Sequence, residues 1–181
     1  MSTRNRLKFQ RHRCFFVTTT CYQHLCLLHS AKCCRIVVDS INYVSKKYSA
    51  DVLAYVLMPN HIHMVLYFTQ ENRLSDFMRD FKKYTSVRIR DEIAHSTPRQ
   101  LSALQYHYRE QLFKVWNDRF HDVCIRTRRD AKIKINYIHN NPLQEHWKLT
   151  ARPSEYAYSS AAFYSTFVQG LIIVRHYRFY F

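Results

Sequence analysis

The stretch YVLMPNHIHMVLYF, residues 55–68, decides the expected fold because it predicts two strands joined by a tight reversal. Pro59 and Asn60 are typical turn residues, and apolar runs flank them on both sides. The strands are expected at residues 51–58 and 62–68. His61 and His63, at the start of the second strand, are two residues apart, so their side chains project from the same face of the sheet.

Two interpretations of this histidine pair remain open on strand geometry alone. Neighbouring imidazoles on a rigid strand present two nitrogen ligands to a metal ion. The same side chains are equally compatible with core histidines that hydrogen bond to nearby groups. The apolar flanks make burial of an imidazole without a polar partner costly. With this cost included, the metal site and the core interpretation are about equally favoured.

The rest of the chain predicts strands and helices alternating around this hairpin. Strands are expected at 14–22 and at 113–125, the latter with a bulge, and helices at 30–48, 74–93 and 129–141. Residues 94–112 are expected to be irregular, and Pro142 to end the last helix. This order predicts an α+β fold with a ferredoxin-like βαββαβ core, one antiparallel sheet with helices on one face. The expected division is a basic arm (1–13), a single domain (14–165) and a C-terminal tail (166–181).

The charge of the chain indicates nucleic acid as the partner. Among 181 residues, 28 lysines and arginines oppose 13 aspartates and glutamates, for a net charge of +15. The chain also has 14 tyrosines and 12 phenylalanines. Basic and aromatic residues together suit a single strand, because unpaired bases stack on aromatic rings. Composition does not distinguish DNA from RNA.

Composition excludes several other classes of function. A single glycine, Gly170, leaves no glycine-rich phosphate loop and no dinucleotide-binding fingerprint. No run of about 18 apolar residues predicts a membrane span, and no secretory signal is recognisable. We therefore expect a cytoplasmic, nucleoid-associated protein whose six cysteines are reduced thiols. The spacing of Cys21, Cys26 and Cys33 matches no common zinc-ligand pattern.

The last expected helix contains IKINYIHNNP, residues 133–142, in which Tyr137 and Asn141 share one helical face. If that face packs against the histidine pair, two imidazoles and an amide oxygen surround one cation within reach of a phenol. A metal or a base makes tyrosine a usable nucleophile. In a chain with 14 tyrosines, a packing role for Tyr137 is the simpler interpretation of that residue alone.

Together these motifs resemble those of the REP-associated tyrosine transposases, a group within the single-tyrosine HUH (His, hydrophobe, His) family. The similar segments occur in the family's order: YVLMPNHIHMVL, FMRDFKKYTSVRI, VWNDRFHDVCIRT, INYIHNNPLQEHWKL and PSEYAYSSAAFY. The resemblance covers about residues 13–165, nearly the whole chain. The resemblance implies the HUH nuclease fold. It also implies a metal-dependent endonuclease and strand-transferase that acts on single-stranded hairpin DNA in DNA transposition.

The resemblance also implies roles for individual residues. His61 and His63 would bind a divalent cation, Mg²⁺ or Mn²⁺, and Asn141 would complete the site. Imidazole ligands favour Mn²⁺ as the better supporter of activity in vitro. Tyr137 would attack the scissile phosphate, giving a 5′-phosphotyrosyl intermediate and a free 3′-hydroxyl. His139, on another face of the helix, is the alternative third ligand if the helix is distorted before the proline.

Basic residues in the arm, in the second helix and before the third helix are candidates for holding DNA phosphates. They are Arg11, Arg13, Arg79, Lys82, Lys83, Arg126, Arg128 and Arg129. A solvated surface charge is an equal alternative for each. The family pattern is broken at residues 143–148, LQEHWK, where related proteins carry small residues including a glycine.

Two other functions remain open at this point. One is a catalytically silent protein on the same fold that binds nucleic-acid hairpins as a regulator. The other is a metal-dependent RNA-binding or RNA-cleaving protein. Retention of His61, His63 and Tyr137 favours the enzyme over the silent binder. We expect a monomer or homodimer with no membrane contact.

Overall fold

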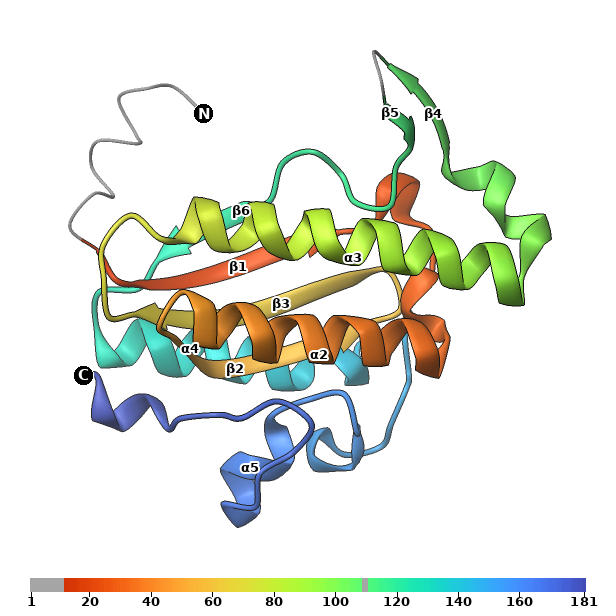
Figure 1. Ribbon diagram of the computed structural model, residues 1–181. Coiled ribbons are helices and arrows are strands. Elements are labelled where there is room, and N and C mark those ends of the chain that lie inside the picture. The colour runs from red at the N-terminus through yellow and green to blue at the C-terminus, as the bar shows by residue number, and fades with distance from the viewer. Residues whose placement is uncertain (1–11, 109–110) are drawn as a thin grey trace.

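The computed structural model describes residues 12–108 and 111–181. Its centre is a four-stranded antiparallel sheet in the order β2-β3-β1-β6 (Figure 1). The strands are β1 (Cys14–Thr20), β2 (Ala50–Met58), β3 (His61–Phe68) and β6 (His121–Cys124). The expected hairpin is confirmed, since β2 and β3 pair directly across Pro59-Asn60.

β3 is an inner strand, so both of its edges are hydrogen bonded. On one side, Thr18 of β1 lies opposite His63 and Thr20 lies opposite His61. On the other side, Val56 of β2 lies opposite His63. The histidine pair is therefore fixed by the two neighbouring strands.

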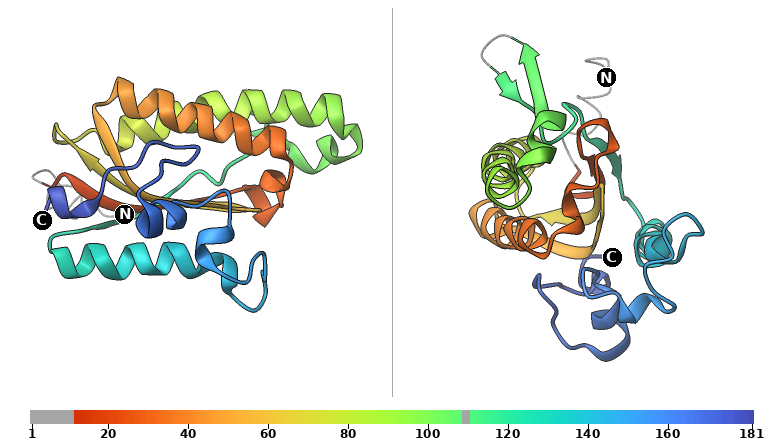
Figure 2. Two further views of the ribbon diagram at one scale, coloured as in Figure 1. Left: turned by 90° about the horizontal axis from the view of Figure 1, so that it is seen from below. Right: turned by 90° about the vertical axis from the view of Figure 1, so that its right-hand side faces the viewer.

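The helices lie on both faces of the sheet, as Figure 2 shows. α2 (Ala31–Lys47) and α3 (Leu74–Ser96), the helices within the βαββαβ core, pack side by side on one face. α4 (Arg128–Asn140) follows the core and covers the opposite face through Ala131, Ile135 and Ile138. The sheet thus separates two apolar clusters. The predicted α+β fold is confirmed, and its third helix stands alone on its face.

The segment before β6 departs from the expected continuous strand over 113–125. Trp116 bridges Cys21, and β6 resumes pairing with β1 only at His121. Between these two points, residues 117–120 lie opposite only Thr19 and Thr20 of β1, so the ladder is interrupted and the strand is shorter than predicted. Before it, the expected irregular region contains a second hairpin formed by β4 (Gln105–Tyr108) and β5 (Gln111–Phe113).

The C-terminal segment packs on the free edge of β2. After α5 (Ala161–Thr166), Val174 forms a parallel bridge with Val52, and the Arg175 backbone N–H donates to the Val52 carbonyl at 2.9 Å. Short 3₁₀ turns occur at Tyr22–His24, Leu27–His29, Pro98–Leu104, Asn141–Leu143, Pro153–Glu155 and Tyr177–Phe179. Among the described residues, no helix combines the length and apolar character needed to cross a membrane.

Candidate active site

The two histidines of β3 project toward α4, on the face away from α2 and α3. Their ring centroids are 4.7 Å apart. His63 is only 5% exposed, and Phe16 of β1 stacks on its ring at 5.3 Å. The prediction that the pair shares one face of a strand is confirmed.

Neighbouring side chains orient both imidazoles through the same ring atom. Nδ1 of His63 lies 2.8 Å from Oγ1 of Thr18, and Nδ1 of His61 lies 2.6 Å from Oδ1 of Asn60. A partner at Nδ1 sets the tautomer and leaves Nε2 as the nitrogen for a ligand. Both rings are thus held in the manner typical of metal-binding histidines.

Burial keeps both histidines in the neutral form. Desolvation lowers the pKa of His61 to about 4; the charges of His24 and His146 add to this, and the Asn141 side chain opposes it. Desolvation also lowers the pKa of His63 to about 3, with further contributions from His61 and Lys134. Neutral imidazole is the form that binds metal, so no proton competes at neutral pH.

α4 brings Tyr137 to the histidine pair. Thr127 caps the helix by accepting a hydrogen bond from the Asp130 backbone N–H at 3.1 Å. The Tyr137 ring centroid lies 5.3 Å from that of His63 and 5.9 Å from that of Phe16. Unlike His63, Tyr137 is 45% exposed. The nucleophile candidate therefore borders the histidine pair while its own side chain stays accessible.

Asn141 lies one turn beyond Tyr137, where the chain passes from α4 into a 3₁₀ turn. It is 2% exposed, and its side-chain amide nitrogen has no hydrogen-bond partner among the described residues. This nitrogen is a donor and cannot bind a cation, so Asn141 would reach a metal ion only through its amide oxygen, Oδ1. The described residues hold no group of three His, Cys, Asp or Glu side chains suited to a metal ion. The set that fits a divalent cation is thus two neutral imidazoles and this amide.

His139, the alternative third ligand, points elsewhere. It is buried, with Nε2 2.9 Å from Oγ of Ser160, and burial lowers its pKa to about 4. Ser160 in turn accepts from the Tyr55 backbone N–H at 3.0 Å. His139 therefore fixes α4 to β2 and takes no part in the candidate site.

Comparison with known proteins identifies the family and the fold of the chain. The model of the IS200-like transposases matches residues 8–141 of the chain. The chain belongs to this family. Its structure is similar to that of a REP-associated tyrosine transposase bound to a REP hairpin, with a TM-score of 0.63 and 18% identity over 91% of this chain and 86% of the other. This likeness shows a shared fold.

A putative transposase from Deinococcus radiodurans R1 also matches, with a TM-score of 0.48 and 16% identity over 71% of this chain and 90% of the other. No curated protein sequence matches the chain.

Three residues of this IS200-like transposase join the site without having been singled out from the sequence. Thr18 and Phe16 reach it because β1 pairs with β3. Lys134 lies one turn before Tyr137, with Nζ 4.8 Å from the centroid of the Phe16 ring. The lysine was detectable, because Lys134, Tyr137 and Asn141 follow helical spacing. The strand residues were not, because their register depends on a distant segment.

The candidate DNA-binding residues of the transposase fall into two groups. Arg126, Arg128 and Arg129 are exposed at the beginning of α4, on the side of the sheet that carries the site, and Arg13 is exposed at the start of β1. Arg11 lies outside the described residues. A role in DNA binding stays a prediction for each of them.

The second group, on α3, lies on the opposite face of the sheet. Arg79 forms ion pairs with Asp76 at 2.6 Å and Asp80 at 3.1 Å. Lys82 is partly buried, donates to the Asn117 carbonyl at 2.7 Å, and has its pKa lowered to about 8 by desolvation. Lys83 is exposed. The structure thus gives Arg79 and Lys82 intramolecular partners, and their role in DNA binding also stays a prediction.

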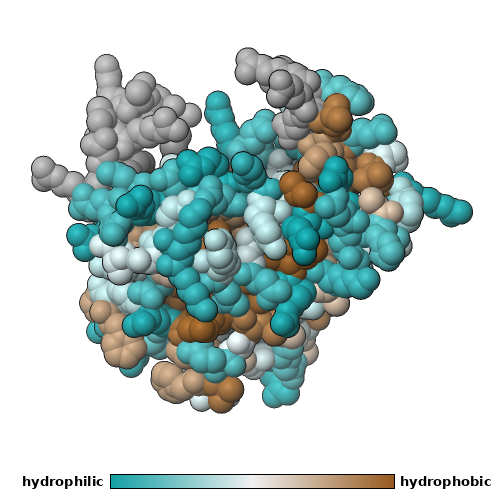
Figure 3. Space-filling model, viewed as in Figure 1, coloured by the Kyte–Doolittle hydropathy of each residue, from teal (hydrophilic) through white to brown (hydrophobic). Residues whose placement is uncertain are grey.

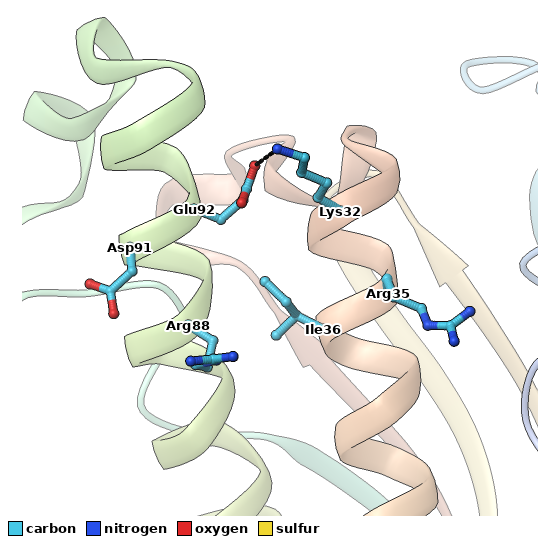
Figure 4. A pocket seen from close by; sticks show the side chains of 6 residues that line it. All are labelled: Lys32, Arg35, Ile36, Arg88, Asp91 and Glu92. Atoms are coloured by element: carbon cyan, nitrogen blue, oxygen red, sulfur yellow. Dashed lines mark ion pairs between the residues drawn. The ribbon is translucent and has the colours of Figure 1, made fainter.

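The outer surface over α2 and α3 is largely hydrophilic (Figure 3). A pocket between these two helices contains an ion pair, with Nζ of Lys32 3.3 Å from Oε1 of Glu92 (Figure 4). It is lined by Lys32, Arg35, Ile36, Arg88, Asp91 and Glu92. The sheet separates this pocket from the histidine pair, so the two are unrelated.

Proposed function

We propose that this transposase cleaves and rejoins single-stranded DNA at hairpins through a 5′-phosphotyrosyl intermediate on Tyr137. In this proposal His61, His63 and Asn141 hold a divalent cation. The observation that carries it is the approach of an exposed tyrosine to a buried, neutral imidazole, with ring centroids 5.3 Å apart within one chain.

The donor set fits Mn²⁺ or Mg²⁺, with imidazoles favouring the former and an amide oxygen compatible with both. Bound there, the cation would polarise the non-bridging phosphate oxygens and offset the charge that builds up in the transition state. Thr18 and Asn60 supply the orientation by holding Nδ1 of each histidine. Because Phe16 covers His63, water has little access to this side of the site.

Tyr137 would perform the covalent step. Its phenolic oxygen attacks phosphorus, the bond from phosphorus to the 3′-oxygen breaks, and the tyrosine becomes esterified to the 5′-phosphate. The phenolic proton is released and the departing 3′-oxygen takes up a proton. Attack by a 3′-hydroxyl on the phosphotyrosine reverses these changes, so rejoining needs no ATP. Lys134, one turn earlier on α4, adds a positive charge beside the phosphate.

Hairpin DNA is the proposed partner. The net charge of +15 favours a polyanion, and the solved REP-associated transposase is bound to a REP hairpin. A DNA substrate also places the protein at the nucleoid. We include monomer and homodimer as working forms.

A covalent-adduct assay tests the proposal. The protein is incubated with an end-labelled DNA hairpin carrying single-stranded flanks and Mn²⁺, and products are separated on a denaturing gel. We expect a protein–DNA adduct that is lost with EDTA and in Tyr137→Phe. The matched control is Tyr84→Phe, which alters a tyrosine that is 51% exposed on α3, and it should retain the adduct.

Other outcomes would contradict the proposal in distinct ways. An adduct that persists in Tyr137→Phe would assign the nucleophile to another residue. DNA binding without an adduct on any hairpin would favour the catalytically silent binder. An adduct formed with an RNA hairpin and not with DNA would assign the enzyme to RNA.

A further inference from the structure

The two tryptophans of the chain have contrasting surroundings. Trp116 is 4% exposed, and its indole N–H donates to Oγ1 of Thr85 at 2.9 Å. Trp147 is partly exposed, and its indole N–H has no partner among the described residues. Tryptophan that is only structural usually satisfies this donor, as Trp116 does. Trp147 thus packs against the apolar cluster on the α4 face of the sheet and yet remains partly exposed, unlike the buried Trp116.

Trp147 lies at the edge of the candidate active site. Its ring centroid is 6.1 Å from that of His61 and 5.4 Å from that of His146. His146 and Lys148 on either side of it are exposed. The indole is therefore flanked by a metal-ligand candidate on one side and by groups that suit phosphate on the other.

The backbone holds this indole in a fixed place relative to the site. The Trp147 backbone N–H donates to the Gln144 carbonyl at 2.8 Å, and the Leu149 N–H donates to the Pro142 carbonyl at 2.9 Å. Lys148 has a φ of 45°, in the left-handed region that reverses the chain. The turn thus closes on the residue that follows Asn141. A pre-positioned aromatic ring costs little entropy when it binds.

We propose that Trp147 is the stacking surface for the nucleobase adjacent to the scissile phosphate. This inference rests on the proposed function only for the position of the scissile phosphate. A phosphate beside His61 and Tyr137 puts the neighbouring base at the indole, and every base has a π-face that can stack there. His146 lies beside the indole, and the exposed Lys148 of the same turn is available to the sugar–phosphate chain.

Intrinsic fluorescence tests the stacking directly and needs neither metal nor cleavage. A twelve-nucleotide single-stranded DNA of mixed sequence is titrated into the full-length protein with EDTA present. We expect saturable quenching of tryptophan emission as the base stacks. A matched oligonucleotide made of abasic deoxyribose units should bind without quenching. In Trp147→Phe the quenching should vanish, because the remaining Trp116 is buried.

Affinity provides the second measurement, by anisotropy of a fluorescein-labelled strand. Trp147→Leu should weaken binding about five- to one-hundred-fold, the range for losing one base–aromatic stack. Tyr43→Leu is the matched control, since Tyr43 is 66% exposed on α2, on the other face of the sheet, and its loss should leave affinity within twofold. Thermal unfolding and Trp116 emission verify that each variant is folded.

Two results would overturn the inference. One is DNA binding that saturates without any change in native emission. The other is a folded Trp147→Leu that binds DNA within twofold of the native protein. If the native protein forms the covalent adduct but shows no quenching, only the stacking surface is refuted. If the native protein shows quenching but forms no adduct, only the proposed chemistry is refuted.

Discussion

Replacing Thr18 by valine removes a single hydroxyl at the point where β1 supports His63. Oγ1 of Thr18 lies 2.8 Å from Nδ1 of His63, and the two residues are directly opposite each other in the sheet. Valine keeps the β-branched shape that suits a strand. The substitution therefore leaves the packing of β1 in place and deprives a 5% exposed imidazole of the partner that fixes its tautomer and rotation.

The expected magnitude follows from this geometry. A buried ring nitrogen left without a partner costs about 1–3 kcal/mol of folding stability. Loss of an orienting partner lowers metal affinity by about 10–100-fold, equivalent to about 1.4–2.7 kcal/mol. The covalent-adduct rate at limiting Mn²⁺ should fall by the same factor and should recover when the Mn²⁺ concentration is raised.

Calorimetric titration with Mn²⁺ measures the effect without any DNA. Thr18→Ser restores the hydroxyl and should restore affinity to within about threefold, since a seryl hydroxyl has the same hydrogen-bonding capacity. Thr20→Val is the matched control, because Thr20 lies opposite His61 and its hydroxyl has no hydrogen bond in the described structure. Native affinity in Thr18→Val, or an equal loss in Thr20→Val, would refute the assignment of Thr18.

Three further results are expected. Burial lowers the pKa of His139 to about 4, so between pH 6.5 and pH 4 the unfolded chain binds a proton at this residue that the folded protein does not. His139 alone should therefore lower stability by about 3 kcal/mol toward pH 4, in addition to the losses from His61 and His63, whose pKa values burial also lowers. Urea unfolding across this range should show a smaller loss in His139→Gln, and an unchanged loss would contradict the assignment. Arg129→Ala should reduce the log–log salt slope of single-strand binding by about 0.7, while Arg79→Ala, already paired with aspartates, should leave it unchanged. Equal effects would place DNA on both faces. A mixture of the Tyr137→Phe and His63→Ala variant proteins should form no adduct, because both residues are proposed to act in the site of the same chain. Adduct formation by the mixture would show that the site is shared between two copies.

The sequence was sufficient for the hairpin and for the face of each element on which its histidines and Tyr137 lie. Alternation in β3 puts His61 and His63 on one face of the sheet, and helical spacing puts Tyr137 and Asn141 on one face of α4. The contact between these two faces was the part that the structure had to supply. That contact depends on which face α4 covers. Strand and helix periods describe each element separately and do not determine how the elements pack.

Long-range pairing explains what sequence patterns missed. Thr18 supports His63 only because β1 and β3 align in one register, 45 residues apart in the chain. Lys82 looked like a surface cation, yet it is partly buried and holds the Asn117 carbonyl. The predicted strand over 113–125 ignored the interruption after Trp116, where the ladder with β1 breaks. In each case a distant segment decided the outcome.

α4 is held rigidly by its buried side chains while Tyr137, on the same helix, remains accessible, and this combination suits covalent chemistry. Ile135 and Ile138 are buried against β2, and His139 bonds to Ser160, so the helix is fixed in place. Tyr137 lies between these anchors on the exposed side of the same helix. A phosphotyrosyl product would need room for the attached strand, whereas the proposed metal ligands need burial to remain neutral. One helix meets both demands because residues one position apart point to different faces. The position of Tyr137 on α4 therefore meets the need for access without exposing the histidine pair that it borders.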